Sequence, residues 1–203
     1  SDRLMLDCVQ LIQLFTEDST MPATFKVISL LLLSILSCLN AESKTHVFEA
    51  SLISPIQIHS EEDSINGLRL GLLKSHNKDV SGFDLGFIAH SDGDFKGLQF
   101  AISNYTGKTF RGAKAGLINA TIGDSKSIEF GLANWNEGDH AGIQLGALNL
   151  SQEKVRGIQA GFVNYAYDLK GLQFGFVNYT AQMKGLQIGF LNFHGKAEYL
   201  KFF

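Results

Sequence analysis

The sequence predicts an all-β repeat protein, and three observations carry that prediction. A glycine-containing motif recurs from Gly67 with a 15-residue period, which shortens to a 14-residue period towards the C-terminal end. Within each copy, apolar residues alternate with glycine or polar residues, which is the period of a β-strand. The composition agrees, because 21 glycines, 16 phenylalanines and only 2 prolines among 203 residues suit many strands joined by tight turns.

The N-terminal part of the chain predicts export. Residues 21–26 carry one positive charge, an apolar run with two serines follows at 27–36, and Ala41 ends a small-residue cleavage site. The run is too short to span a bilayer, which needs about 20 residues. We therefore interpret residues 21–41 as a signal peptide and residues 1–20 as an upstream extension outside the fold. A lipoprotein acylated at Cys38 is the alternative.

The next element is an N-terminal strand with an acidic turn, within residues 42–66. Residues 47–58 alternate like a strand, and Glu61, Glu62 and Asp63 form the turn. We group residues 47–66 with the repeats as one domain, and expect the strand to add a tenth element to the nine copies.

Nine copies of one unit occupy residues 67–203. The unit is Gly-apolar-x-apolar-Gly-apolar-apolar-Asn-aromatic, and we number its positions from 1 at the first glycine. Position 1 is Gly67, Gly82, Gly97, Gly112, Ser127, Gly142, Gly157, Gly171 and Gly185. In the clearest copies the repeat residues are Gly157, Gln159, Gly161, Asn164, Gly171, Gln173, Gly175, Asn178, Gly185, Gln187, Gly189 and Asn192.

Positions 2, 4 and 6 share one face of each expected strand, and every residue at these positions is apolar in all nine copies. Such a face must meet a dry medium, either a protein core or lipid. The opposite face is glycine and polar. We therefore expect it to be wet or to line a narrow polar lumen, with Arg69, Asp84, Lys114 and Glu129 as candidate lumen residues.

One way to stack the copies is an antiparallel β-meander that closes as a small barrel of about ten strands. An unbroken strand of about eleven residues is roughly 35 Å long. The few residues left over suffice for a hairpin but cannot return along such a strand. Export and a wholly apolar face then favour an outer-membrane barrel, with the apolar side towards lipid.

The alternative is a β-solenoid with 15-residue coils, in which the chain turns at the second glycine of each copy. Identical residues would then stack from coil to coil. The apolar residues of positions 2, 4 and 6 would fill the core, and the glutamines at position 3 would form a ladder. A second ladder would consist of Asn104, Asn119, Asn134, Asn149, Asn164, Asn178 and Asn192.

The repeat unit Gly-apolar-Gln-apolar-Gly-apolar-apolar-Asn, following the strand-like segment 48–58, resembles a family of uncharacterised bacterial surface-repeat proteins of the cell envelope. The resemblance covers about residues 47–203. It implies a location in the envelope and implies no particular biochemical activity.

We expect an exported, non-enzymatic protein of the outer membrane or cell surface, with a structural or pore-like role. The alternative is a surface or periplasmic solenoid that acts as a binding scaffold. A lipid bilayer is the expected partner. The formal net charge of −3 argues against nucleic acid.

No catalytic, cofactor or metal site is expected. The six histidines lack the spacing of known metal motifs, and no pair of residues stands out as an acid and a base. His76 and His90 lie near adjacent turns one repeat apart and could be stacked neighbours. We interpret them as surface turn residues.

Overall fold

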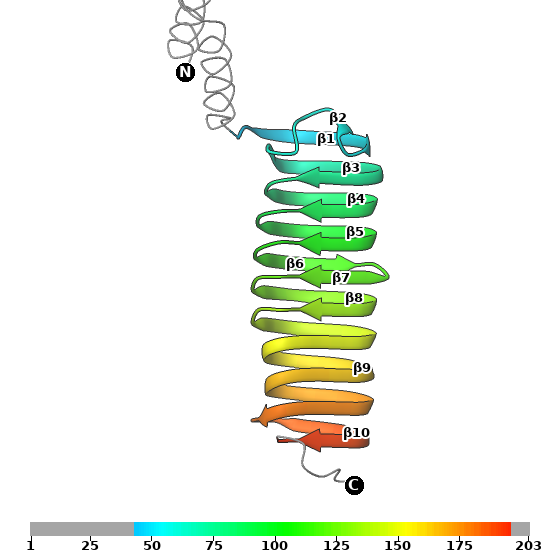
Figure 1. The fold of residues 1–203 in the computed structure, drawn as a ribbon, viewed down its shortest axis with the longest axis vertical. Coiled ribbons are helices and arrows are strands. Elements are labelled where there is room, and N and C mark those ends of the chain that lie inside the picture. The colour runs from blue at the N-terminus through cyan, green and yellow to red at the C-terminus, as the bar shows by residue number, and fades with distance from the viewer. Residues whose placement is uncertain (1–42, 196–203) are drawn as a thin grey trace, which may run out of the picture. The chain divides into compact units, whose positions relative to one another are not determined.

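The computed structural model describes residues 43–195, which form a β-solenoid (Figure 1). Each repeat makes one coil, and neighbouring coils pair in parallel to build a single stack. The sheet order is β10-β9-β8-β6-β5-β4-β3-β1-β2, with β7 beside β5 and β8. The all-β prediction is confirmed. The antiparallel barrel is wrong, because successive repeats pair in parallel, and the solenoid alternative is the observed fold.

The strands follow the repeat closely, and β9 runs without interruption through three copies. Their bounds are β1 (Thr45–Ile53), β2 (Ile56–Gln57), β3 (Ser64–Asn77), β4 (Val80–Ser91), β5 (Phe95–Thr106), β6 (Phe110–Ala115), β7 (Ile118–Thr121), β8 (Ser125–Asn136), β9 (His140–Met183) and β10 (Leu186–His194).

The pairing register equals one repeat, so each residue lies beside its equivalent in the next coil. Gly82 pairs with Gly97, and Asp84 with Gln99. The 14-residue copies keep the same rule, since Asn192 pairs with Asn178. Stacked coils therefore place like side chains on like, as in other solenoids.

The chain bends between positions 6 and 7, and this bend explains the wrong barrel prediction. Phe87 and Ile88 are adjacent, yet both are exposed, at 52% and 45%. Strict alternation would bury one of them. Each coil therefore consists of two short segments joined at this corner. The turn at Asp92–Asp94 closes the coil, so no part of the chain needs to travel back along a long strand.

The N-terminal coil differs from the single strand expected over residues 47–58. β1 pairs in parallel with β3, so that Glu49 lies beside Arg69. After Pro55 the chain folds back, and β2 pairs antiparallel with β1 through Ser51 and Gln57. Residues 43–63 thus form a cap on the first full coil.

The interior is mostly polar, so the expectation that the apolar residues of positions 2, 4 and 6 fill the core is wrong. Leu85 and Phe87 are 48% and 52% exposed, whereas Asp84 between repeat glycines is completely buried. Apolar residues enter the interior mainly two places before position 1. There they form two clusters, one of Ile65, Val80, Phe95 and Phe110, the other of Val155 and Leu169 with Met183 against it; Ala166, from position 10, completes the second cluster.

Several predictions concern segments outside the described residues. These are the signal peptide at 21–41, the upstream extension at 1–20, acylation at Cys38 and the repeat domain beyond residue 195. Within residues 43–195, no helix has the length and apolar character needed to cross a membrane.

Candidate functional site

An asparagine ladder runs through the interior at position 8. The Nδ2 of each asparagine donates to the Oδ1 of the next at 2.8 Å. The second N–H also finds an acceptor, as in the bond from Asn119 to the backbone oxygen of Phe130 at 2.8 Å. Buried amides would be costly without such partners. The ladder is the one expected for a solenoid, and its members are Asn104, Asn119, Asn134, Asn149, Asn164, Asn178 and Asn192.

The glutamines at position 3 form a second ladder of opposite direction. Gln187 donates to Gln173, Gln173 to Gln159, and Gln159 to Gln144, each at 2.7 Å. The chain of donors ends on a carboxylate, because Gln144 donates to Glu129 Oε2 at 3.1 Å. Aligned donors that end on a negative charge strengthen one another, so this ladder stabilises the ionised form of Glu129.

Arg69 and Asp84 form a buried bidentate ion pair in the first two full coils. The Nε and Nη2 atoms of Arg69 donate to the two carboxylate oxygens at 2.9 and 2.7 Å. Nη1 donates to the backbone oxygen of His90 at 2.8 Å, and Nη2 also reaches Ser91 Oγ at 3.3 Å. Both charged side chains are fully buried, so these added bonds offset a large desolvation cost.

Lys114 and Glu129 form the second buried charged pair, without direct contact. Lys114 Nζ donates to Thr121 Oγ1 at 2.6 Å and lies 4.0 Å from the centre of the Phe110 ring. Burial lowers the pKa of Lys114 to about 8, against an opposing effect of Glu129. Burial also favours neutral Glu129, but Lys114, His140 and several hydrogen bonds outweigh it and hold the pKa of that carboxyl below its usual value.

The structure thus places the four candidate lumen residues inside the solenoid. They form two pairs, and the two residues of each pair come from neighbouring coils. Arg69 and Asp84 touch, and Lys114 and Glu129 interact through the field between them. They line no open channel, since all four are at most 1% exposed. The sequence signal for this pairing is that the members of each pair occupy the same position of consecutive repeats.

The repeat glycines are required by close approach between coils. A Cβ on Gly161 would lie 1.9 Å from the backbone oxygen of Gly146 and 2.7 Å from Asn149 Nδ2. Gly157 has a φ of +145°, and a Cβ there would lie 1.9 Å from the oxygen of Gly142. Position 5 therefore leaves room for the asparagine ladder, and position 1 for the neighbouring backbone.

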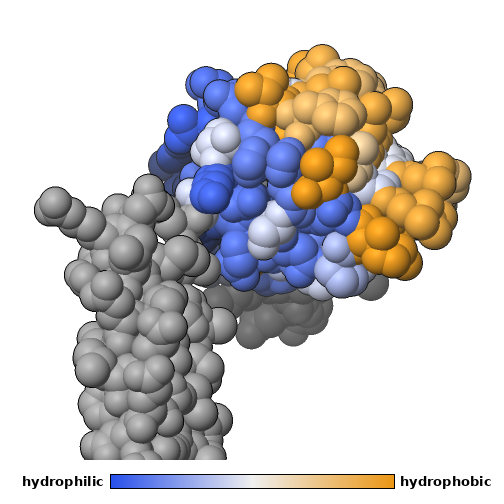
Figure 2. Space-filling view, turned by 90° about the horizontal axis from the view of Figure 1, so that it is seen from above, coloured by the Kyte–Doolittle hydropathy of each residue, from blue (hydrophilic) through white to orange (hydrophobic). Residues whose placement is uncertain are grey.

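Opposite this interior, the outward side of positions 2, 4 and 6 forms what we call the apolar face. Figure 2 looks along the stack and shows hydrophobic residues gathered on one side and hydrophilic residues on the other. At about 4.8 Å per coil, nine coils extend the face over roughly 40 Å. Its large exposed side chains, at 36–66%, are Leu68, Leu72, Phe83, Leu85, Phe87, Leu98, Phe100, Ile102, Leu117, Ile128, Phe130, Leu132, Phe162, Phe174, Phe176, Leu186, Ile188 and Phe190.

A row of basic residues borders the apolar face. The residue just before position 1 points outward on the same segment, and in six copies it is Lys or Arg. These residues are exposed, and we call them the basic row: Lys96, Arg111, Lys126, Arg156, Lys170 and Lys184.

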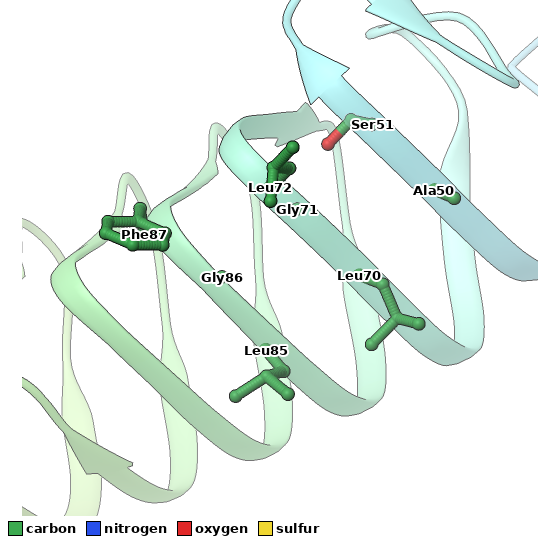
Figure 3. A pocket seen from close by; sticks show the side chains of 8 residues that line it. All are labelled: Ala50, Ser51, Leu70, Gly71, Leu72, Leu85, Gly86 and Phe87. Atoms are coloured by element: carbon green, nitrogen blue, oxygen red, sulfur yellow. The ribbon is translucent and has the colours of Figure 1, made fainter.

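The apolar face has a shallow depression of about 460 Å³ over β1, β3 and β4 (Figure 3). Leu70, Leu72, Leu85 and Phe87 project around it, and Ser51 is the one polar side chain among its lining residues. A reactive pocket would bring several polar or titratable groups together. This depression instead suits apolar contact.

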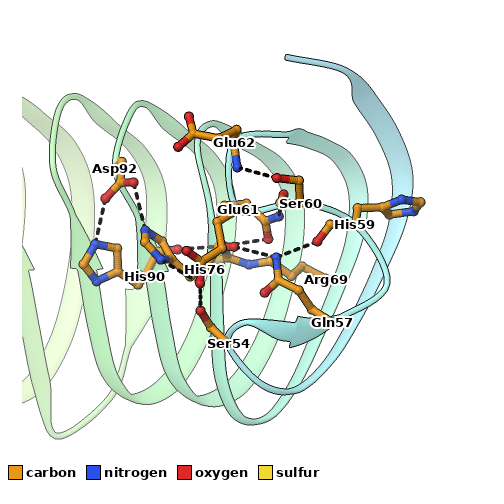
Figure 4. Close-up of polar contacts among 11 residues, drawn as sticks. Ser54, Gln57, His59, Ser60, Glu61, Glu62, Arg69, His76, His90 and Asp92 are labelled. Carbon is orange, nitrogen blue, oxygen red and sulfur yellow. Dashed lines mark hydrogen bonds and ion pairs between the residues drawn. The ribbon is translucent and has the colours of Figure 1, made fainter. Parts of the chain in front are cut away.

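A cluster of histidines and carboxylates lies near the ends of β3 and β4 (Figure 4). His76 and His90 are neighbours in adjacent coils, with ring centres 4.4 Å apart in an edge-to-face arrangement, and both contact Asp92. Burial lowers the pKa of His90, against a raising effect of its hydrogen bond to Asp92. The register brings the two histidines side by side, as their spacing of one repeat allowed. Their interpretation as surface turn residues is wrong, because both lie within strands and are partly buried.

The fold and these features define a β-solenoid with a hydrogen-bonded polar interior and an amphipathic outer surface. No protein-family model, curated protein or solved structure shows a significant match to the chain.

Proposed function

We propose that this protein is a non-enzymatic binding scaffold of the bacterial cell envelope, and that its apolar face adsorbs to the surface of an anionic lipid bilayer. The predicted export signal and the resemblance to surface-repeat envelope proteins support the location. The pore-like role depended on the barrel and is not retained. The scaffold role corresponds to the solenoid alternative.

The size of the apolar face is the observation that carries the proposal. The largest apolar patch on a monomeric soluble protein is typically about 300–600 Å². Three rows of exposed Leu, Ile and Phe side chains over nine coils exceed that range. Phe162, Phe176 and Phe190 are representative, since they stack at 5.0 Å between ring centres while remaining 45–66% exposed. Such a surface needs a partner that removes it from water.

The basic row selects a lipid surface as that partner. Apolar rings that enter the interface beside Lys and Arg that reach headgroups are the arrangement of proteins that lie on membranes. Each basic residue near an anionic membrane contributes about 1 kcal/mol of attraction. An apolar protein partner would gain nothing from a row of six like charges along one border.

Flotation with vesicles tests the proposal. The full chain is mixed with vesicles of phosphatidylglycerol and phosphatidylethanolamine, or of neutral phosphatidylcholine. We expect the protein to float with anionic vesicles, and to float less in high salt because surface attraction is screened. The triple variant Phe162→Ser, Phe176→Ser, Phe190→Ser should remain at the bottom of the gradient.

A matched control keeps the result specific. Ile122, Trp135 and Tyr167 are also exposed apolar residues, but they lie outside positions 2, 4 and 6. Changing these three to Ser should leave flotation unchanged. Equal loss in both triple variants, or a dimer in light scattering that persists while vesicles stay unbound, would overturn the lipid assignment.

A further inference from the structure

We propose that His76, His90 and Asp92 form a binding site for a divalent transition metal, with zinc as the best match. This site is separate from the apolar face. His76 near the end of β3 pairs in register with His90 near the end of β4. Asp92 begins the turn after β4, and Figure 4 shows its carboxylate reaching both rings. Oδ2 lies 2.8 Å from His76 Nε2, and Oδ1 lies 2.9 Å from His90 Nε2.

The donor set matches the preference of zinc. Two imidazole nitrogens and one carboxylate oxygen are common zinc ligands, and three protein ligands leave a fourth position for water. The three ligand atoms lie within 4.8 Å of one another. Tetrahedral bonds of about 2.0–2.2 Å to one ion put ligand atoms about 3.3–3.6 Å apart. Binding would therefore widen the two contacts of Asp92, now 2.8 and 2.9 Å, as the ion replaces these hydrogen bonds. The side chains of His76, His90 and Asp92 are 18%, 27% and 58% exposed, so an ion can enter from solvent.

Glu61 supplies a second, independent feature of a metal site. Its Oε1 lies 3.5 Å from His76 Nδ1, the ring nitrogen that would not bind the ion. Ligating histidines usually donate this other N–H to a carboxylate or carbonyl, which fixes the ring and raises its basicity. Glu61 is itself held by Ser54, whose hydroxyl donates to the same Oε1. The cap residues thus orient His76 from behind.

Ring stacking alone does not account for the cluster. Position 9 is aromatic in several other copies, and His90 stacks on Tyr105 with ring centres 4.4 Å apart. Any aromatic ring at residue 90 would serve that purpose. Stacking does not require Asp92 at both Nε2 atoms or Glu61 at Nδ1. His90→Tyr therefore separates the two roles, because it copies the residue of the next coil and removes the ligand.

Zinc titration of the untagged full chain by calorimetry tests the proposal, with Co²⁺ absorption as a second readout. We expect one Zn²⁺ per chain. His90→Tyr and Asp92→Asn should each weaken binding by about 100-fold or more, and Glu61→Gln by about 10-fold, the size of outer-shell effects. His46→Gln is the matched control, since His46 also contacts a carboxylate of the cap, Asp63, at 3.2 Å. It should bind zinc like the unaltered chain.

Circular dichroism and thermal melting of each variant show whether it is folded. Weak millimolar binding by the unaltered chain would overturn the site, and so would unchanged affinity in folded His90→Tyr. Loss of binding in His46→Gln with retention in Asp92→Asn would move the ion to His46 and His59, whose ring centres lie 3.5 Å apart, and reject the assignment. Vesicle flotation is independent of all these outcomes.

Discussion

Ala101 occupies the second-glycine position of the repeat in the coil that directly follows Ala89. Every other described copy has glycine at this position. In six of these copies, the coil before carries a ladder asparagine at position 8. A Cβ on those glycines would lie 2.4–2.9 Å from the Nδ2 of the asparagine one coil before. Ala89 carries no amide, so the methyl group of Ala101 has room. Position 8 of one coil and position 5 of the next are therefore coupled by contact.

This coupling predicts that Ala89→Asn needs Ala101→Gly. Asn104 Oδ1 and Ser75 Oγ are both buried without a hydrogen-bond partner, above and below residue 89. An asparagine there could serve both groups, and each new bond contributes about 1 kcal/mol. Ala89→Asn alone should lose about 1–3 kcal/mol of stability through overpacking against Ala101. Ala101→Gly alone should lose about 0.5–1 kcal/mol.

The double variant should be at least as stable as the unaltered chain. Urea unfolding of all four proteins gives the interaction energy, which must be about 1.5–4 kcal/mol in favour of the pair to cancel the losses of the two single variants. Strict additivity of the two changes would show that the asparagine does not reach the next coil.

The ladder also predicts that its centre costs more to break than its end. Asn149→Ala removes the acceptor of Asn134 and the donor of Asn164, both of which are buried. Each unpaired group costs about 1–3 kcal/mol, so we expect a loss of about 3–5 kcal/mol in unfolding free energy. Asn192→Ala removes one ladder bond, from Asn178, and one bond to the backbone oxygen of Gly189, both in the partly buried last described coil, and should cost about 1–2 kcal/mol.

Hydrogen exchange locates the damage. Backbone amides of coils on both sides of residue 149 should lose protection in Asn149→Ala, because coils are stabilised by their neighbours. Similar losses of stability in the two variants would contradict a continuous ladder.

Charge removal at Lys114 and Glu129 predicts a non-additive result. Either single change to Gln leaves one buried charge uncompensated, which costs about 3–5 kcal/mol. With Gln at both positions, the glutamine ladder, whose last member is now Gln144, would continue through residues 129 and 114 to Gln99. The Oε1 of Gln99, which has no partner, would then accept a hydrogen bond. We expect the double variant to equal or exceed the unaltered chain in urea unfolding. A double variant that loses more than either single one would contradict this.

The sequence was sufficient to predict which residues stack. Asn164 and Asn178, or Gln159 and Gln173, gain from identical spacing only when equivalent positions lie side by side. The same logic could have paired Arg69 with Asp84. The direction of pairing was harder, because alternation across Gly86 and Phe87 suggests one straight strand until the outward position of Ile88 is known.

Which face points inward could not be predicted from the alternation. A period of two separates Asp84 from Leu85 but does not say which of them is inside, and general hydrophobicity favours Leu85. The decision rests on contacts between coils. Gly161 abuts the amide of Asn149, so the corner holds a ladder amide and has no room for larger side chains. The repeat spacing allowed His76 and His90 to be neighbours, but the contact of both rings with Asp92 in the following turn is known only from the structure.

The last prediction concerns the dependence of stability on pH at Lys114. Its pKa is lowered from 10.5 to about 8 in the folded chain, chiefly by burial. Between these two pH values the unfolded chain binds more protons, so stability should rise as pH increases from about 8 to 10.5. The upper limit of the gain is about 3 kcal/mol, and the attraction of Glu129 for the ammonium is already contained in the folded-state pKa of about 8. Urea unfolding across this range measures the slope, and subtraction of the slope of Lys114→Gln isolates the contribution of this one side chain. Equal slopes in the two proteins would mean that Lys114 is not desolvated in the folded state.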